Sequence, residues 1–531
     1  MATVDEKPIV RARPSGGRAA RHAHRSKPLE RDVSPIRGGF EGGAYKPLST
    51  AQLEMVHEAA LDILETIGMG DHVEPWRDLI CANGGWVDEA GRLCFPKAMV
   101  RDAIAKAGRN FTLCGRDPKH DMYVADGRVY YTGGSATVQA LDVNTGDFRQ
   151  TVLQDLYDYT RLEDTLANMH FVIRQCIANE LSDARELDIN TAYAVMSGTT
   201  KHIVTSFFDP EHLREAVRMY DMSLGEGVSF RDRPFAQAIV VVSVSPLKFS
   251  PEGCHVLKAA VEEGMPAIMV SVPQSGATSP AALAGHLTQG HAEVLAALTY
   301  VNLLKPGHPV LFGNWPFVTD MRTGAFIGGG GEFAVLAAAA AQLGRYLDIP
   351  TGIASGMSDS KLPDVQSGWE KGFLTALPGL AGGNLIYESA GILASVMASS
   401  YEAFVIDNDM LGNVIRAIRG IEVTEETLSL DNIKATVDGA GHFLADRQTL
   451  QMMETEYYYP KIADRQNIGG WKASGATDMR RRAQDVVRRT LSTHFPGHID
   501  DATDATIRRH FNIRLDRAVM KPGPGRWYDP Q

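Results

Sequence analysis

The feature that most constrains this fold is a series of short apolar segments, each followed by a polar loop and then a stretch with helical spacing. Eight such segments cover residues 170–178, 202–208, 238–247, 267–273, 309–315, 350–356, 384–389 and 403–409. Helix candidates such as 251–264 and 332–347 lie between them. Apolar strands that alternate with helices predict an α/β fold with a parallel sheet covered on both faces. Eight such units predict a (β/α)8 TIM-type barrel.

A doubly wound sheet is the alternative architecture, but its usual phosphate-binding motifs, GxGxxG after a first strand and GxxxxGK[ST], do not occur. We expect four regions along the chain. They are a disordered basic arm (1–44), an N-terminal α/β region (45–165), the barrel core (166–410) and a C-terminal helical extension with a tail (411–531). Ser49 or Thr50 is predicted to cap the first helix, and residues 127–142 are the clearest strand of the N-terminal region.

The composition of the chain limits the kinds of binding partner and the cellular compartment that we expect. The net charge is -11, although residues 1–40 are basic, so an acidic body disfavours nucleic acid as a partner. No apolar run is long enough to span a membrane. The 5 cysteines are scattered without CxxC spacing, which favours a reducing cytoplasm over a disulfide framework. An Arg-rich transit peptide at the N-terminus is the alternative, disfavoured by Asp5 and Glu6.

Polar and aromatic side chains gather directly after the predicted strands, where barrel enzymes form their active sites. They are Asp320, Asp359, Asp364, Glu388, Asp407, Asp409, Gln274, Asn314, Gln366, Trp315, Phe317, Trp369 and Tyr387. Paired histidines and a nucleophile with a base are absent from these loops, so we expect neither a bound metal nor covalent catalysis. Aromatic faces with carboxylates suit a methylated ammonium ion, which has no N–H to donate.

Other interpretations stay open for individual residues. Trp315 and Tyr387 could cap the core, and Asp407 or Asp409 could cap a helix that begins near Met410. Lys361 could form a surface ion pair with its acidic neighbours, which would contribute little to stability.

Several long segments, in this order, resemble the trimethylamine:corrinoid methyltransferases. They are "FTLCGRD" (111–117), "SGATSPAALAGHLTQGHAEVLAAL" (275–298), "SGMSDSKLPDVQSGWEKG" (355–372), "LAGGNLIYESAGIL" (380–393) and "VIDND" (405–409). The resemblance runs from about residue 45 to about residue 490. It implies a (β/α)8 barrel that passes a methyl group from a methylamine to the Co(I) of a separate corrinoid-binding protein. It also implies a homo-oligomer, with cobalamin supplied by the partner and no cofactor on this chain.

The central residue of the segment 355–372 sets this chain apart from the trimethylamine enzymes. In those enzymes the position that corresponds to Met357 is pyrrolysine. Met357 cannot act as an electrophile, so the chain resembles the non-pyrrolysine branch, which includes enzymes that demethylate quaternary amines such as glycine betaine. A quaternary ammonium already carries its positive charge and leaves as a neutral amine, so no activating residue is required.

The resemblance leads to a set of expected roles. The catalytic candidates are Met357, Asp359, Gln366 and Glu388, and the substrate-binding candidates are Gln274, Asn314, Trp315, Phe317, Tyr387 and Asp407. Glu388 is expected either to project into the cavity or to be a helix N-terminal charge. The alternatives are the same chemistry on proline betaine, carnitine, choline or a dimethylsulfonium, or a barrel that binds a methylated ligand or a corrinoid protein without turnover.

Overall fold

The computed structural model describes residues 34–225 and 227–527. Residues 1–33, which make up most of the predicted basic arm, lie outside the described residues. Contacts divide the described residues into two units, one of residues 34–37 with 422–459 and the other of residues 38–225 and 227–421 with 460–527. The smaller unit contains the helices α13 (Leu430–Asp438) and α14 (Arg447–Thr455).

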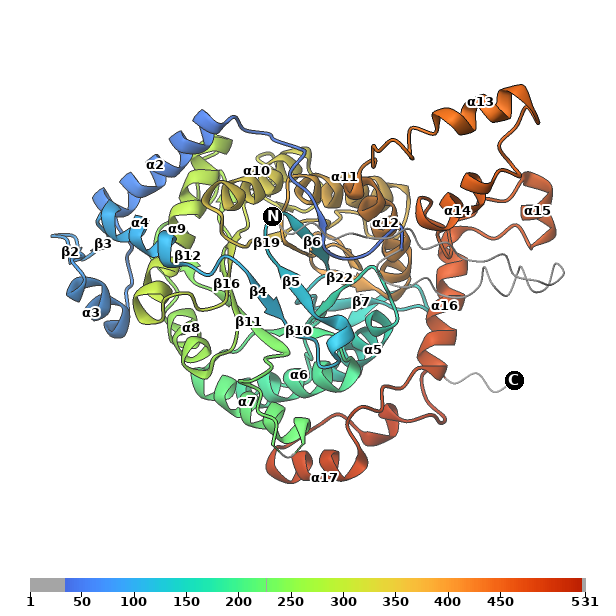
Figure 1. Ribbon diagram of the computed structural model, residues 1–531. Helices are drawn as coiled ribbons and strands as arrows, with labels where there is room; N and C mark the ends of the chain where they lie inside the picture. The colour runs from blue at the N-terminus through green and yellow to red at the C-terminus, as the bar shows by residue number, and fades with distance from the viewer. Residues whose placement is uncertain (1–33, 226, 528–531) are drawn as a thin grey trace. The chain divides into compact units, whose positions relative to one another are not determined.

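The larger unit is a mixed α/β fold built on parallel strands with helices around them (Figure 1). The strands are β6 (Arg128–Tyr131), β9 (Phe171–Ile173), β10 (His202–Thr205), β11 (Ala236–Val241), β14 (Ala267–Ser271), β16 (Val310–Asn314), β19 (Gly352–Ala354) and β20 (Leu385–Tyr387). One sheet has the order β16-β14-β11-β10-β9, all parallel. The other has the order β1-β6-β20-β19, in which only the edge strand β1 (Phe40–Glu41) is antiparallel.

The edges of the two sheets also contact one another. Phe312 of β16 forms a parallel bridge with Thr351, and its N–H donates to the carbonyl of Pro350 at 2.8 Å. Beside β6 and β9, the N–H of His170 donates to the carbonyl of Tyr131 at 2.7 Å. These hydrogen bonds bring all the strands that carry the site into one assembly.

The helices follow the strands as the sequence predicts. They are α5 (Leu153–Asp164), α6 (Ala184–Gly198), α7 (Pro210–Leu224), α8 (Pro251–Glu263), α9 (Leu283–Leu304), α10 (Gly331–Leu347), α11 (Val365–Leu380) and α12 (Tyr401–Arg419). Short strands extend the loops: β7 (Gln139–Leu141), β8 (Phe148–Gln150), β12 (Ser243–Val244), β13 (Lys248–Phe249), β15 (Gln274–Ser275), β17 (Phe317–Thr319), β18 (Phe326–Ile327), β21 (Ile392–Leu393) and β22 (Ala398–Ser400). The helices expected at 251–264 and 332–347 are confirmed.

The N-terminal region holds α2 (Thr50–Thr66), α3 (Glu74–Ala82), β2 (Trp86–Val87), β3 (Leu93–Cys94), α4 (Lys97–Lys106), β4 (Phe111–Leu113), η2 (Pro118–His120) and β5 (Met122–Val124). The predicted cap of the first helix is confirmed at Ser49, whose hydroxyl and the side chain of Gln52 form a capping box. Helices α2, α3 and α4 pack on α9.

The predicted eighth strand, 403–409, is wrong, because these residues lie inside α12. The hydroxyl of Ser400 accepts from the N–H of Ala403 at 3.2 Å and starts a helix whose inner face is buried. A short buried apolar run cannot be told from a buried helix by periodicity alone. The strand that pairs with β20 is β6, which lies within the predicted N-terminal region, and not the predicted strand 403–409.

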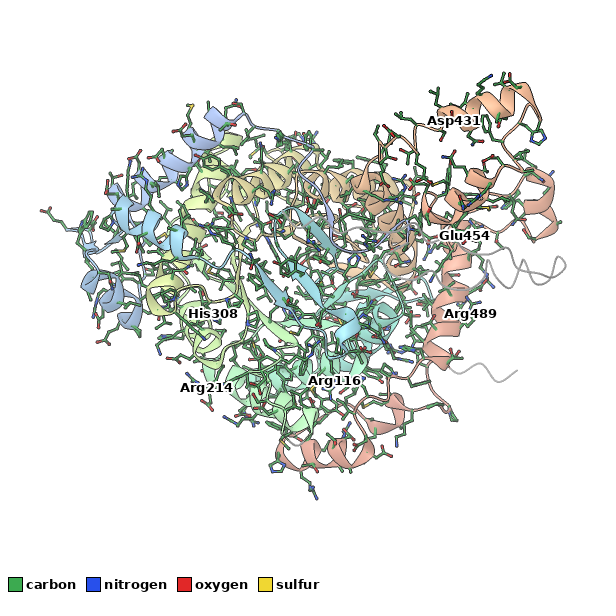
Figure 2. The ribbon with its side chains drawn as sticks, viewed as in Figure 1. Arg116, Arg214, His308, Asp431, Glu454 and Arg489 are labelled. Atoms are coloured by element: carbon green, nitrogen blue, oxygen red, sulfur yellow. The ribbon has the colours of Figure 1, made fainter. Side chains whose placement is uncertain are left out.

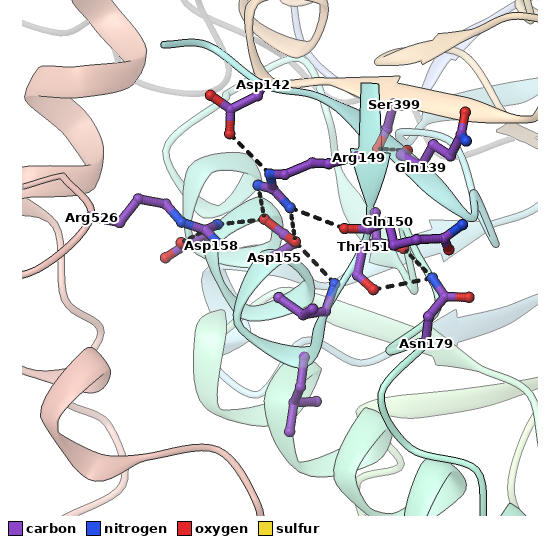
Figure 3. Close-up of polar contacts among 12 residues, drawn as sticks. Gln139, Asp142, Arg149, Gln150, Thr151, Asp155, Asp158, Asn179, Ser399 and Arg526 are labelled. Carbon is purple, nitrogen blue, oxygen red and sulfur yellow. Dashed lines mark hydrogen bonds and ion pairs between the residues drawn. The ribbon is translucent and has the colours of Figure 1, made fainter. Parts of the chain in front are cut away.

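The C-terminal end of the larger unit comprises α15 (Ile468–Ala473), α16 (Met479–Thr493), α17 (Asp501–His510) and η3 (Arg517–Met520). Figure 3 shows how it is attached: Arg526 lies beside Asp155, which Arg149 also contacts. Both oxygens of Asp155 accept from Arg149 at 2.7 Å, and Arg526 donates at 2.5 Å. Burial alone would raise the pKa of Asp155, but these two cations hold it below its usual value.

Asp155 should therefore be a large contributor to stability. The substitution Asp155→Asn leaves two partly buried guanidinium groups without their charge partner, and we expect a loss of about 3 kcal/mol in the free energy of unfolding. Asp485→Asn, which removes an exposed pair with Arg481 (N–O distance 3.8 Å), should change it by less than about 0.5 kcal/mol. Chemical denaturation of both variants measures the difference, and equal losses would contradict this assignment.

Candidate functional site at the carboxyl ends of the strands

Aromatic rings from four positions meet at the carboxyl ends of β16 and β20. The ring of Tyr387 lies 5.7 Å from that of Trp315 and 5.1 Å from that of Phe171, and Phe317 lies 6.3 Å from Trp315, between ring centroids. We call Phe171, Trp315, Phe317 and Tyr387 the aromatic group. Three of them were predicted; Phe171 was missed because it lies at the start of its strand.

The hydroxyl of Tyr387 is fixed inside the fold. It accepts a hydrogen bond of 2.5 Å from Nε2 of Gln237 on β11, and burial raises its pKa far above the usual value. The indole of Trp315 donates to the carbonyl of Gly352 at 2.8 Å. These hydrogen bonds fix the orientations of both rings, which is also what we expect if Trp315 and Tyr387 cap the core. Both rings belong to the aromatic group.

Asn314 does not join the aromatic group. Successive side chains of a strand point to opposite faces, so Asn314 and Trp315 cannot both face the same side. Nδ2 of Asn314 donates to the carbonyl of Leu287 on α9 at 3.1 Å, and Gly290 of that helix lies against its amide. Gln274 is closer to the site, since it pairs in register with Phe317.

The loop after β19 holds Met357 in a closed setting. Met357 is fully buried, and a Cβ added to Gly328 would approach that of Met357 to 2.8 Å. Asp359 ties this loop to two others. Its oxygens accept from the N–H groups of Gly328 (2.8 Å) and Gly329 (3.1 Å) and from the hydroxyl of Ser395 (2.6 Å). Asp359 is therefore committed to holding loops together.

Gln366 and its neighbour Glu370 stabilise the same loop from α11. Gln366 is exposed and donates to Oε1 of Glu370 at 2.8 Å, whereas Glu370 is buried. The other oxygen of Glu370 accepts from the hydroxyl of Ser358 at 2.6 Å and from the N–H of Asp359 at 3.0 Å. The side chain of Gln366 thus acts on the loop of Met357 through Glu370.

Asp407 lies within α12 and forms a buried ion pair. Its Oδ2 is 2.5 Å from Nζ of Lys371 and accepts from the N–H of Gly391 at 2.8 Å. Burial raises the pKa of Asp407, and the charge of Lys371 offsets part of that rise. The alternative in which Asp407 or Asp409 caps a helix near Met410 is wrong, because that helix begins at Tyr401.

The remaining acidic residues of the loops also bind backbone or local groups. Asp364 caps α11, Asp320 contacts Arg322, and Asp409 accepts from the N–H groups of residues 461–463. No ion pair between Lys361 and its acidic neighbours is found in the described residues; Nζ of Lys361 donates instead to the carbonyl of Asp359 at 2.7 Å.

Glu388 sits in a left-handed turn immediately after β20. Its φ is +63°, a conformation that few non-glycine residues adopt. Its carboxylate accepts from the N–H (2.9 Å) and hydroxyl (2.5 Å) of Ser135, and burial raises its pKa to about 7. The next regular element is β21, so the interpretation of Glu388 as a helix N-terminal charge is wrong.

Arg174 follows β9 directly and was missed by the sequence reasoning. It lies within electrostatic range of Asp188, Cys176 and Glu388, and burial lowers its pKa. Within residues 34–225 and 227–527, its guanidinium has neither a hydrogen bond nor an ion pair. A signal was present: Arg174 is the one arginine or acid in the apolar run 170–178.

Comparison with known proteins identifies the family. The model of the family "Trimethylamine methyltransferase (MTTB)" matches residues 14–518. The chain belongs to this family.

Relatives in the trimethylamine methyltransferase family match over most of their length. Trimethylamine methyltransferase MttB of Desulfitobacterium hafniense is 30% identical over 88% of this chain and 94% of that protein. The glycine betaine methyltransferase of Desulfitobacterium hafniense is 28% identical over 87% and 96%. The crystal structure of the Methanosarcina barkeri monomethylamine methyltransferase (MtmB) is 13% identical, with a TM-score of 0.50 over 87% of this chain and 89% of that one, a likeness of fold.

The raised pKa of Glu388 gives a prediction on stability. Between the ordinary carboxyl value of about 4.3 and about 7, the folded protein keeps a proton that the unfolded chain has released. The free energy of unfolding should therefore fall as the pH rises across this window, by about 3 kcal/mol relative to Glu388→Gln. Denaturation of both proteins from pH 4.5 to 7.5 measures it, and parallel profiles would contradict the assignment.

Proposed function

We propose that this protein moves a methyl group from a quaternary amine, glycine betaine or a compound like it, to the Co(I) corrinoid of a separate partner protein. The aromatic group carries this proposal, because ring faces at the carboxyl ends of the strands attract an onium cation without needing an N–H donor. Family membership supports methyl transfer, and the relative named glycine betaine methyltransferase supports the substrate class.

The proposed architecture is a closed (β/α)8 barrel, supported by the bridge between Phe312 and Thr351 and by the hydrogen bond from His170 to Tyr131. The regional boundaries 1–44, 45–165, 166–410 and 411–531 and the homo-oligomer stay predictions. All five cysteines are free thiols, which supports the cytoplasm as the proposed location. None of the described helices has the length and apolar character that a membrane crossing requires.

The proposed chemistry is a displacement at a methyl carbon. The C–N bond breaks, its electron pair stays on nitrogen, and the substrate leaves as a neutral tertiary amine. The partner's reduced cobalt supplies the electron pair for the new bond to carbon, so no proton has to move. Met357 supplies no electrophile, and none is required for a nitrogen that is already quaternary.

This chain contributes orientation and an electrostatic environment. The cationic charge disappears as the methyl group departs, so a close uncompensated carboxylate would stabilise the ground state more than the transition state. Asp359 and Glu388 both accept hydrogen bonds from neighbouring loops, and burial raises the pKa of Glu388. The cation is then held mainly by ring faces, and catalysis comes from positioning.

The substrate assignment is tested by anaerobic spectroscopy of the protein with its reduced corrinoid partner and a panel of methylated amines. We expect conversion of Co(I) to methyl-Co(III) with glycine betaine and none with trimethylamine. Turnover of trimethylamine would show that Met357 does not mark a change of substrate. If only choline or carnitine donates a methyl group, that compound replaces glycine betaine as the assigned substrate. If no onium compound donates a methyl group, the result favours a protein that binds its ligand without turnover.

A substitution in the aromatic group tests its role. Trp315→Leu removes a ring face from the cation, and we expect kcat/KM to fall by about 10-fold, in the range of a partly desolvated cation–π contact. Trp86→Leu, on strand β2 of the N-terminal region, is the control and should leave kcat/KM unchanged. Equal kinetics of the two variants would remove Trp315 from the proposed site.

A further inference from the structure

Arg174 is unusual among the enclosed arginines of this protein. Arg149 and Arg161 each form ion pairs, with Asp155 at 2.7 Å and with Asp158 at 2.7 Å. Arg174 is only partly exposed, yet within residues 34–225 and 227–527 its guanidinium makes neither an ion pair nor a hydrogen bond. Enclosing a cation without a partner is costly, so such a group is retained where an anion will meet it.

The carboxylates near Arg174 are already bound to other groups. Glu388 accepts two hydrogen bonds from Ser135, at 2.9 and 2.5 Å. Asp188 accepts from the N–H of Phe208 at 2.8 Å and lies 2.7 Å from Nδ1 of His212. Both act on Arg174 electrostatically, but among the described residues neither forms an ion pair with it. The five N–H donors of the guanidinium stay available in a fork that matches a carboxylate.

The position of Arg174 connects it with the aromatic group. It follows β9, whose first residue is Phe171, and its electrostatic neighbour Glu388 follows Tyr387 directly. A substrate whose trimethylammonium end lies on the rings would therefore place its other end among the loops that carry Arg174. In the part of the chain that the structure describes, Arg174 is an enclosed cation of these loops whose guanidinium has no partner.

We propose that Arg174 binds the anionic end of the substrate, so that this site selects onium compounds that also carry a carboxylate. The inference rests on the proposed function, because it assumes that the onium end lies on the aromatic group. It favours betaines and carnitine over choline, and it assigns to Arg174 a role in orienting the substrate. Arg174 would be a specificity-determining residue that contacts substrate away from the reacting carbon.

Equilibrium binding to the full-length protein tests the proposal without the corrinoid partner. Isothermal titration would compare glycine betaine with tetramethylammonium, a cation that lacks a carboxylate, in the wild type, Arg174→Met and Arg174→Lys. We expect Arg174→Met to weaken glycine betaine by about 100-fold, as for loss of a charged hydrogen-bonded pair, and to change tetramethylammonium by less than threefold. Arg174→Lys should fall between them, because lysine keeps the charge and loses the fork.

Arg214→Met provides the matched control. Arg214 lies on the outer helix α7 (Figure 2) and pairs with Glu262 of α8 at 3.2 Å, and its loss should leave both affinities unchanged. The proposal is overturned if Arg174→Met weakens both cations equally, if it weakens neither, or if the wild type binds tetramethylammonium as tightly as glycine betaine. If the binding pattern holds but no methyl group is transferred, the proposed function fails and the role of Arg174 stands.

Discussion

Buried and partly buried carboxylates that accept hydrogen bonds from neighbouring loops are the constraint on which this site depends. Asp359 and Glu370 hold the loop of Met357, Glu388 joins the loops after β20 and β6, and Asp407 joins α11, α12 and the N–H of Gly391. Glu293 of α9 likewise accepts hydrogen bonds from the loop after β11 and from the end of β14, donated by three serines and a backbone N–H. Each carboxylate is expensive to bury and is kept because several donors repay its lost hydration.

The same hydrogen bonds shape the electrostatics that a methyl-transfer site requires. Carboxylates saturated by local donors hold an onium cation less tightly than free ones, so the ring faces of Trp315 and Tyr387 become the main attraction. Arg174 adds one positive group without a partner among the described residues, which fits a substrate with charges at both ends. The proposed specificity and the proposed catalysis thus depend on the same feature, the hydrogen bonds that the loop carboxylates accept from local donors.

Much of the fold could be predicted from the sequence because buried parallel strands are nearly continuous apolar runs. The run 403–409 misled for the same reason, since a buried helix segment such as that in α12 is equally apolar. The site was harder to predict. Composition places acids in loops but does not show which accept hydrogen bonds, as Asp359 does, and strand alternation separates Asn314 from Trp315. Arg174 was visible only as a charge within an apolar run.

A crystal structure of the protein with glycine betaine bound would show directly how the site holds its substrate. We expect the trimethylammonium group against the rings of Trp315 and Tyr387, one N-methyl carbon facing the open end of the strands, and the carboxylate within hydrogen-bond distance of Arg174. Betaine bound elsewhere, or with its carboxylate on the aromatic group, would contradict this expectation.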